Sequence, residues 1–197
     1  MTRGNEAADK IKNSTGHPNV QVLQLDLANL ENIKNFASEI KEKFPKIDTL
    51  VCNAGVWFPM EENKKTDDNL EIHTGVNHLG HFLLTNLLIG QLNRVVVVSS
   101  GLMMSGKIDL DDSRQFIEGR RIPEGERKPK HAPIGYCDSK LMNAIFAREL
   151  AIRHKVPISI EKCIKSLTVI KMCRNSTSNF SIFFLECYRG LCGPRLV

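Results

Sequence analysis

Residues 94–100 constrain the fold of this chain more than any other segment. They read RVVVVSS, so four β-branched residues stand in succession before two serines. A strand with one face in water alternates apolar and polar residues, and this run does not alternate. It therefore predicts a strand that is buried on both faces, which is typical of a parallel sheet covered by helices.

Further strands and helices alternate with this strand along the chain. The segments 20–27, 47–52 and 156–160 are short and rich in branched apolar residues, which predicts three more strands. Helical spacing of apolar residues predicts helices over 30–44, 68–92 and 136–154, the first after the N-cap residue Asn29. The alternation predicts an α/β doubly wound, mainly parallel sheet of about four strands, with 20–27 and 94–100 in the same sheet.

The domain boundaries follow from changes in composition. A chain of 197 residues with 42% hydrophobic residues is long enough for one core, and we assign this domain to residues 1–161. Charge, glycine and proline dominate residues 101–133, which predicts a surface insertion. Residues 162–197 lack a clear period, and we expect a divergent, poorly ordered tail. Its apolar run 180–185 either packs on an exposed sheet or promotes aggregation.

Several functional classes are disfavoured by composition. The net charge is +5, but no basic stripe interleaved with aromatics suggests nucleic-acid binding. No apolar run of membrane-spanning length or signal peptide is found, so we expect a soluble, cytoplasmic chain. The six cysteines lack paired metal-ligand spacing, which predicts free thiols and no metal site.

Tyr136 and Lys140 lie one helical turn apart and therefore project from the same helix face. A tyrosine hydroxyl, with an ordinary pKa of about 10, is a poor acid or base at neutral pH, and a nearby lysine cation lowers that pKa. The pair therefore suits general acid/base chemistry. The structural alternative is an interfacial tyrosine beside a solvated lysine.

Small and polar residues end the other predicted strands. Ser99 and Ser100 follow the valine run, and Asn53-Ala54-Gly55 follows the strand 47–52. Open α/β sheets bind ligands at the carboxyl edge of their strands, where a serine can bind a carbonyl and small residues let backbone approach a ligand. Asp26 ends another strand and either accepts from an adenine amino group or caps the following helix. Ordinary strand-end polarity and a simple turn are the alternatives for the serines and for Asn53-Ala54-Gly55.

These residues occur in the order and rough spacing of short-chain dehydrogenases/reductases. The segments 75–88, 106–110 and 135–141 resemble the retinol-dehydrogenase-like branch of that family. The resemblance covers about residues 1–160 and rests on Asp26-Leu27, Asn53-Ala54-Gly55, Asn77, Ser100 and Tyr136-Cys137-Asp138-Ser139-Lys140. It implies an incomplete Rossmann-like, NAD(P)-binding domain.

The resemblance implies hydride transfer between a nicotinamide cofactor and an alcohol or carbonyl, of retinol-like or another lipophilic kind. Tyr136 would be the general acid/base, and Lys140 would lower its pKa and hold the ribose. Ser100 would polarise the carbonyl, and Asn77 would anchor a proton-relay water.

The resemblance also implies a cofactor site. Asp26, Leu27 and Asn53-Ala54-Gly55 would line it beside Tyr136 and Lys140. Arg3 resembles the basic residue of members that use a phosphorylated cofactor, which favours NADP over NAD, although a frayed terminal arginine is the alternative.

The chain also departs from the family pattern. We find neither the glycine-rich turn that binds pyrophosphate nor the Pro-Gly turn that contacts nicotinamide, and we expect a chain truncated at its N-terminus with impaired activity. The alternative function is a catalytically silent isoform or fragment. It would form a homodimer through 68–92 and 136–154, which form the dimer interface in the family.

Overall fold

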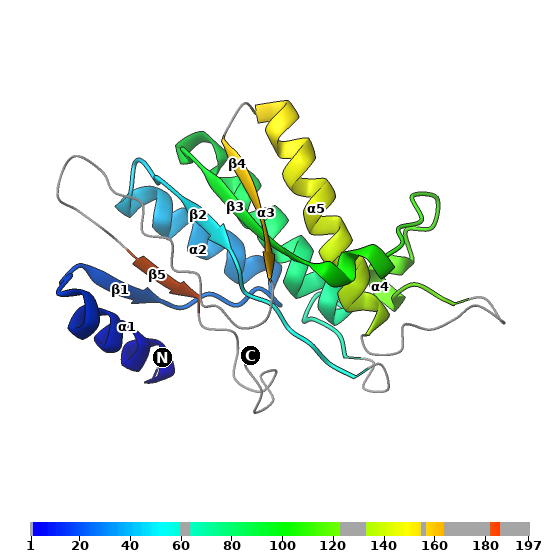
Figure 1. Cartoon of the computed structure of the whole chain (residues 1–197), viewed down its shortest axis with the longest axis horizontal. Helices are drawn as coiled ribbons and strands as arrows, with labels where there is room; N and C mark the ends of the chain where they lie inside the picture. The colour runs from blue at the N-terminus through cyan, green and yellow to red at the C-terminus, as the bar shows by residue number, and fades with distance from the viewer. Residues whose placement is uncertain (1, 60–63, 123–132, 155–156, 164–181, 186–197) are drawn as a thin grey trace.

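The computed structural model describes residues 2–59, 64–122, 133–154, 157–163 and 182–185 (Figure 1). Helices and strands alternate along most of this chain. The elements are α1 (Thr2–Thr15), β1 (Val20–Leu23), α2 (Leu30–Lys43), β2 (Leu50–Cys52), the π-helical segment η2 (Thr74–Gly80), α3 (His81–Leu88), the 3-10 turn η3 (Ile89–Gln91), β3 (Val95–Ser100), the 3-10 turn η4 (Gly101–Ser105), α4 (Gln115–Glu118), α5 (Ile134–His154), β4 (Ile158–Cys163) and β5 (Ile182–Leu185).

All strand pairs within these residues are parallel, as the valine run predicted. β2, β3 and β4 form one sheet in that order, with Cys52 opposite Val97 and Val97 opposite Ile160. β1 pairs with β5 in a separate two-stranded sheet. The prediction that 20–27 and 94–100 share a sheet is therefore wrong. No described strand lies between β1 and β2 to join the two ladders.

The hydrophobic core lies between β3 and three helices. Val95 and Val97 are almost completely buried, and the same core includes apolar residues of α2, α3 and α5. The predicted apolar face of α2 is confirmed, because its buried residues are Ile33, Phe36, Ala37 and Ile40. Asn29 caps this helix, since its side chain accepts a hydrogen bond from the Asn32 amide at 2.8 Å.

Two helical predictions need correction. The single helix expected over 68–92 is divided into η2, α3 and η3. It also begins later than expected, because the Glu71 carboxylate accepts the amides of His73 and Thr74 and so fixes the first turn there. No helix was predicted over Thr2–Thr15, where the structure has α1. This helix packs against β1, as Figure 1 shows, and gives that strand a helical neighbour.

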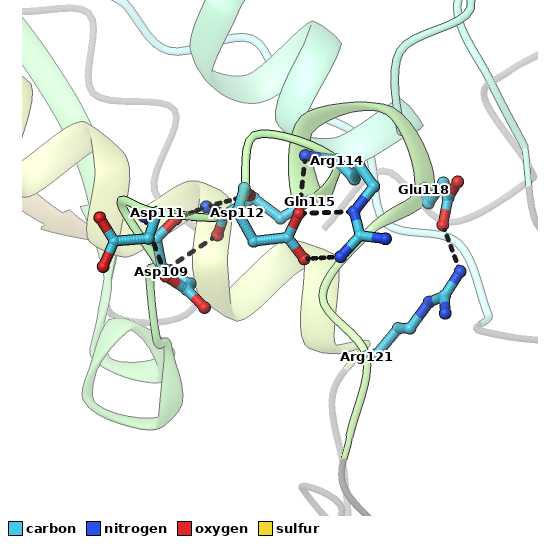
Figure 2. Close-up of polar contacts among 7 residues, drawn as sticks. All are labelled: Asp109, Asp111, Asp112, Arg114, Gln115, Glu118 and Arg121. Carbon is cyan, nitrogen blue, oxygen red and sulfur yellow. Dashed lines mark hydrogen bonds and ion pairs between the residues drawn. The ribbon is translucent and has the colours of Figure 1, made fainter.

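The insertion predicted over 101–133 is partly helical where the structure describes it. It contains η4 and α4, and residues 123–132 lie outside the described part. Hydrogen bonds and ion pairs among its own residues hold this segment together. Figure 2 shows Arg114 paired with Asp112, Arg121 paired with Glu118, and the Gln115 side chain bonded to the segment that carries Asp109.

The tail predicted to be poorly ordered contains one described strand. β5 pairs with β1 from Val20 opposite Ile182 to Leu23 opposite Leu185. The remaining tail, apart from the end of β4, lies outside the described residues. Four residues of the apolar run 180–185 thus form a strand that pairs with β1, and the two alternatives for this run, packing on an exposed sheet or aggregation, stay predictions.

Two further sequence expectations concern cysteines and membranes. Cys52 and Cys137 are buried free thiols, as predicted, and burial raises the pKa of Cys52 to about 11. The other cysteine side chains lie outside the described part. Within the described part, no helix is long and apolar enough to cross a membrane, and no cluster of His, Cys, Asp or Glu could hold a metal ion.

Close packing between η2 and the backbone at Leu27 predicts a stability effect. A Cβ atom added at Gly80 would lie 2.8 Å from the Leu27 carbonyl oxygen, which belongs to rigid backbone. We expect Gly80→Ala to lower the free energy of unfolding by about 1–3 kcal/mol, measured by urea denaturation. Gly90→Ala is the matched control, because nothing lies within 4 Å of its added Cβ. Equal effects of the two substitutions would contradict this packing.

Candidate active site

Buried polar side chains gather where β3 ends and α5 begins. Such groups are rarely buried without partners, so a cluster of them indicates a built network or a functional site. The members are Asn77, Ser99, Ser100, Ser139, Lys140 and Asn143, none of them more than 7% exposed.

Asn77 connects the loop after β2 with α5. Its Oδ1 atom accepts the Val56 amide at 2.6 Å, and its Nδ2 atom donates to the Val56 carbonyl at 3.1 Å. The same Nδ2 atom donates to Ser139 Oγ at 3.2 Å. The side chain of Asn77 is therefore committed to protein partners on both sides.

The backbone of Asn77 is held as well. Its carbonyl oxygen accepts hydrogen bonds from Asn143 Nδ2 and from His81 Nδ1, both at 3.1 Å. Asn143 Nδ2 also donates to the Val98 carbonyl at 3.3 Å, and its Oδ1 atom pairs with His78 Nδ1. Asn143 thereby links η2, α5 and β3.

Lys140 is buried beside this network, and only 4% of its surface is exposed. Its ammonium donates to the Val98 carbonyl at 3.2 Å and lies 5.5 Å from the ring centre of Tyr136. The structure thus brings Tyr136, Lys140 and Asn77 into one region.

The Tyr136 ring also has aromatic neighbours. Its centre lies 4.6 Å from the Trp57 ring and 6.3 Å from the His73 ring, which meets it edge-on. His73 Nε2 accepts the Phe58 amide, so His73 Nδ1 carries the proton and donates to Glu71 at 2.7 Å. Burial raises the pKa of Glu71, but the hydrogen bonds from the His73 side chain and from the backbone amides of His73 and Thr74 outweigh it, and the pKa lies below its usual value.

The two serines contact different partners. Ser99 Oγ donates to the Lys140 carbonyl at 2.7 Å and ties the end of β3 to α5. Ser100 Oγ accepts the Leu102 amide at 3.3 Å and caps η4. Ser100 thus lies at the carboxyl end of β3, next to Ser99, whose hydroxyl binds the Lys140 carbonyl.

The predicted cofactor residues fall into three groups. Asn53 and Gly55 are exposed after β2, and a Cβ on Gly55 would lie 3.1 Å from Asn77 Oδ1 and 3.8 Å from Lys140 Nζ. Asp26 Oδ1 accepts the Ala28 amide at 2.9 Å in the turn before α2, a helix that Asn29 caps, and burial raises the pKa of Asp26. The remaining three are the buried Leu27 near Gly80, the half-buried Ala54 and the exposed Arg3 in α1.

Sequence reasoning missed four members of this site. Ser139 and Asn143 share a helix face with Tyr136 and Lys140, three and seven residues after Tyr136, and this helical spacing is the signal that could have found them. Trp57 and His73 come from loop and helix segments that carry no comparable spacing. Only the folded chain brings them to Tyr136.

Burial of His81 predicts acid sensitivity of the folded state. Burial, assisted by the charges of Lys140 and His78, lowers the pKa of His81 to about 4 against a hydrogen bond to Asn77 that raises it. The unfolded chain, with a pKa of about 6.5, binds more protons between these values, so stability present above about pH 6.5 falls as the pH approaches 4. Between about pH 6.5 and 5 we expect a loss of about 2 kcal/mol from His81. In urea titrations His81→Gln should lose less stability over this interval, and an unchanged pH slope would contradict the assignment.

Comparisons with known proteins show which family this chain resembles. The family model described as short chain dehydrogenase matches residues 1–108. Retinol dehydrogenase 14 of Mus musculus is 41% identical over 137 residues, covering 67% of this chain and 37% of that protein. Retinol dehydrogenase 12 of Homo sapiens is 39% identical over 161 residues, covering 78% of this chain and 46% of that protein. The chain therefore spans less than half the length of these curated relatives.

Solved structures give the same result. An uncharacterized protein from Mycobacterium paratuberculosis has a TM-score of 0.64 and 32% identity, covering 86% of this chain and 57% of its own. An alcohol dehydrogenase from the archaeon Thermococcus sibiricus, complexed with 5-hydroxy-NADP, has a TM-score of 0.54 at 18% identity, covers 80% of this chain and 58% of its own, and supports the fold alone. With the parallel sheet and the family match over more than half of its residues, the chain belongs to the short-chain dehydrogenase family.

Proposed function

We propose that this chain carries the acid/base site of an NADP(H)-dependent oxidoreductase that interconverts an alcohol and a carbonyl compound. The observation that carries the proposal is the buried Lys140 ammonium, 5.5 Å from the ring centre of Tyr136. Lysine side chains are rarely buried so completely, and this ammonium donates to the Val98 carbonyl and lies beside the Tyr136 ring.

The surroundings fit a nicotinamide cofactor. Gly55 is exposed, and a Cβ there would lie 3.1 Å from Asn77 Oδ1, closer than usual, so glycine leaves the backbone open beside Asn77 and Lys140. In the proposal Gly55, Asn53 and Lys140 hold the middle of the cofactor, and Asp26 lies toward its adenosine. NADP is favoured over NAD because Arg3 offers a cation at the chain's first helix.

In the proposed reaction the cofactor supplies or accepts the hydride. In the direction of reduction, the Tyr136 hydroxyl gives its proton to the carbonyl oxygen while the carbonyl carbon gains the hydride, which leaves a phenolate. Lys140 stabilises that phenolate, and Ser100 donates a hydrogen bond to the carbonyl oxygen. Asn77 and Asn143 keep α5 at a fixed distance from the loop after β2. The relay water expected at Asn77 stays a prediction.

The substrate class is part of the proposal. Relatives named retinol dehydrogenase support a retinol-like or other lipophilic alcohol or carbonyl. We expect low turnover from this chain. Its sequence lacks a glycine-rich pyrophosphate turn, and poor positioning of the reactants can forfeit about 7 kcal/mol or more of barrier reduction.

Tyr136→Phe tests the proposed chemistry. We expect wild-type chain to bind NADPH weakly in calorimetry and to oxidise it slowly with all-trans-retinal or a simple ketone. Tyr136→Phe removes the transferable proton and should lower kcat by about a hundredfold or more, with the NADPH dissociation constant within about threefold of wild type. Tyr188→Phe changes the chain's other tyrosine and serves as the control. Unchanged turnover in Tyr136→Phe would contradict the proposal.

A catalytically silent dimer is the second candidate function, because the helices expected to form an interface carry exposed apolar residues. Ile145 and Ile152 of α5 are 45% and 62% exposed. If they meet a second copy, Ile145→Glu should shift the chain from dimer to monomer in sedimentation velocity. Leu110→Glu, at a 90% exposed position of the insertion, should leave the mass unchanged. A wild-type chain that sediments as a monomer would rule out this candidate.

A further inference from the structure

Trp57 is the only tryptophan of the chain, and its backbone is fixed on both sides. Val56 is held through its amide and its carbonyl by Asn77, and the Phe58 amide donates to His73 Nε2 at 3.0 Å. The side chains of Val56 and Phe58 are buried, 5% and 6% exposed, whereas Trp57 is 48% exposed. Because buried and exposed side chains alternate here, the indole of Trp57 points away from the core while the side chains of Val56 and Phe58 hold the backbone in place.

The indole lies against the tyrosine of the site. The ring centres of Trp57 and Tyr136 are 4.6 Å apart with planes tilted by 53°, and the ammonium of Lys140 lies 5.5 Å from the Tyr136 ring centre. His73 meets the same ring edge-on. A molecule that reaches the Tyr136 hydroxyl therefore approaches a ring with Trp57, His73 and Lys140 as neighbours, and among these Trp57 offers by far the largest exposed apolar surface.

We propose that Trp57 is a specificity-determining residue, whose half-exposed indole forms a wall of the substrate site beside Tyr136 and favours flat, conjugated or aromatic carbonyl compounds and alcohols. Aromatic and conjugated faces pack in offset or tilted arrangements with ring centres 4.5–7 Å apart, the geometry that Trp57 already adopts with Tyr136. A saturated, puckered ring of the same size makes less contact with the flat face of the indole than a planar ring does. The inference rests on the proposed function, because it takes Tyr136 as the group that contacts the substrate oxygen.

A matched pair of ketones tests the inference with the full chain. Acetophenone is flat and conjugated, and cyclohexyl methyl ketone has the same carbon skeleton with a saturated ring. Dissociation constants of both are measured by ligand-observed NMR titration, with and without NADPH, for wild type, Trp57→Phe and Trp57→Leu. Phe82→Leu is the control, because Phe82 is an aromatic residue, 43% exposed, that contacts His78 and Phe146 instead of Tyr136.

We expect wild type, Trp57→Phe and Phe82→Leu to prefer acetophenone, and Trp57→Leu to lose about three- to tenfold of that preference. An equal preference in Trp57→Leu and wild type, or no binding of either ketone to wild type, would overturn the inference. NADPH oxidation is measured in a separate assay, so that a failure of the proposed function can be distinguished from a failure of the inference about Trp57. A Trp57-dependent preference without oxidation would reject the proposed function alone, whereas oxidation with an unchanged ratio of kcat/KM values in Trp57→Leu would reject the inference alone.

Discussion

The two-way hydrogen bonding of Asn77 with Val56 is the interaction on which the rest of the site depends. It fixes the loop after β2 to a π-helical turn, and the bond to Ser139 extends the connection to α5. π-helical turns leave backbone groups without their regular helical partners, and here the Asn77 carbonyl oxygen accepts hydrogen bonds from Asn143 Nδ2 and His81 Nδ1 instead. One asparagine thus places β2, η2 and α5 at fixed distances, and Lys140 and Tyr136 follow because they are rigidly attached to α5.

Much of the fold and of the site follows from local sequence, and the remainder depends on contacts between distant segments. The valine run ending in Ser100 predicts a buried parallel strand, and helical spacing places Tyr136 beside Lys140. The split of the strands into two sheets could not be predicted, because the pairing of β1 depends on a partner near residue 182. The contact of Trp57 and His73 with Tyr136 could not be predicted either, since it results from tertiary packing and not from a regular spacing in the sequence.

The insertion is connected to the same helix by an ion pair of low exposure. Arg120 Nε contacts Asp138 Oδ2 at 3.1 Å, with the two side chains 13% and 4% exposed, and the Lys107 amide donates to Asp138 Oδ1 at 2.8 Å. Burial nonetheless raises the pKa of Asp138 above its ordinary value, against these partners. Removing one partner of such a pair generally costs more than the pair contributes, because the other charge is left buried. The insertion and the acid/base helix are therefore coupled in stability.

The ladder between β1 and β5 has a consequence for how the protein is made. Val20 pairs with Ile182, so this contact spans most of the chain. During synthesis β1 leaves the ribosome long before its partner exists, and its backbone groups on that edge stay unpaired through most of translation. Contacts between residues so far apart in the sequence form slowly, and an unpaired strand edge can pair with a strand of another chain. Yield in the cell is therefore expected to depend on chaperone capacity and growth temperature more strongly than equilibrium stability alone implies.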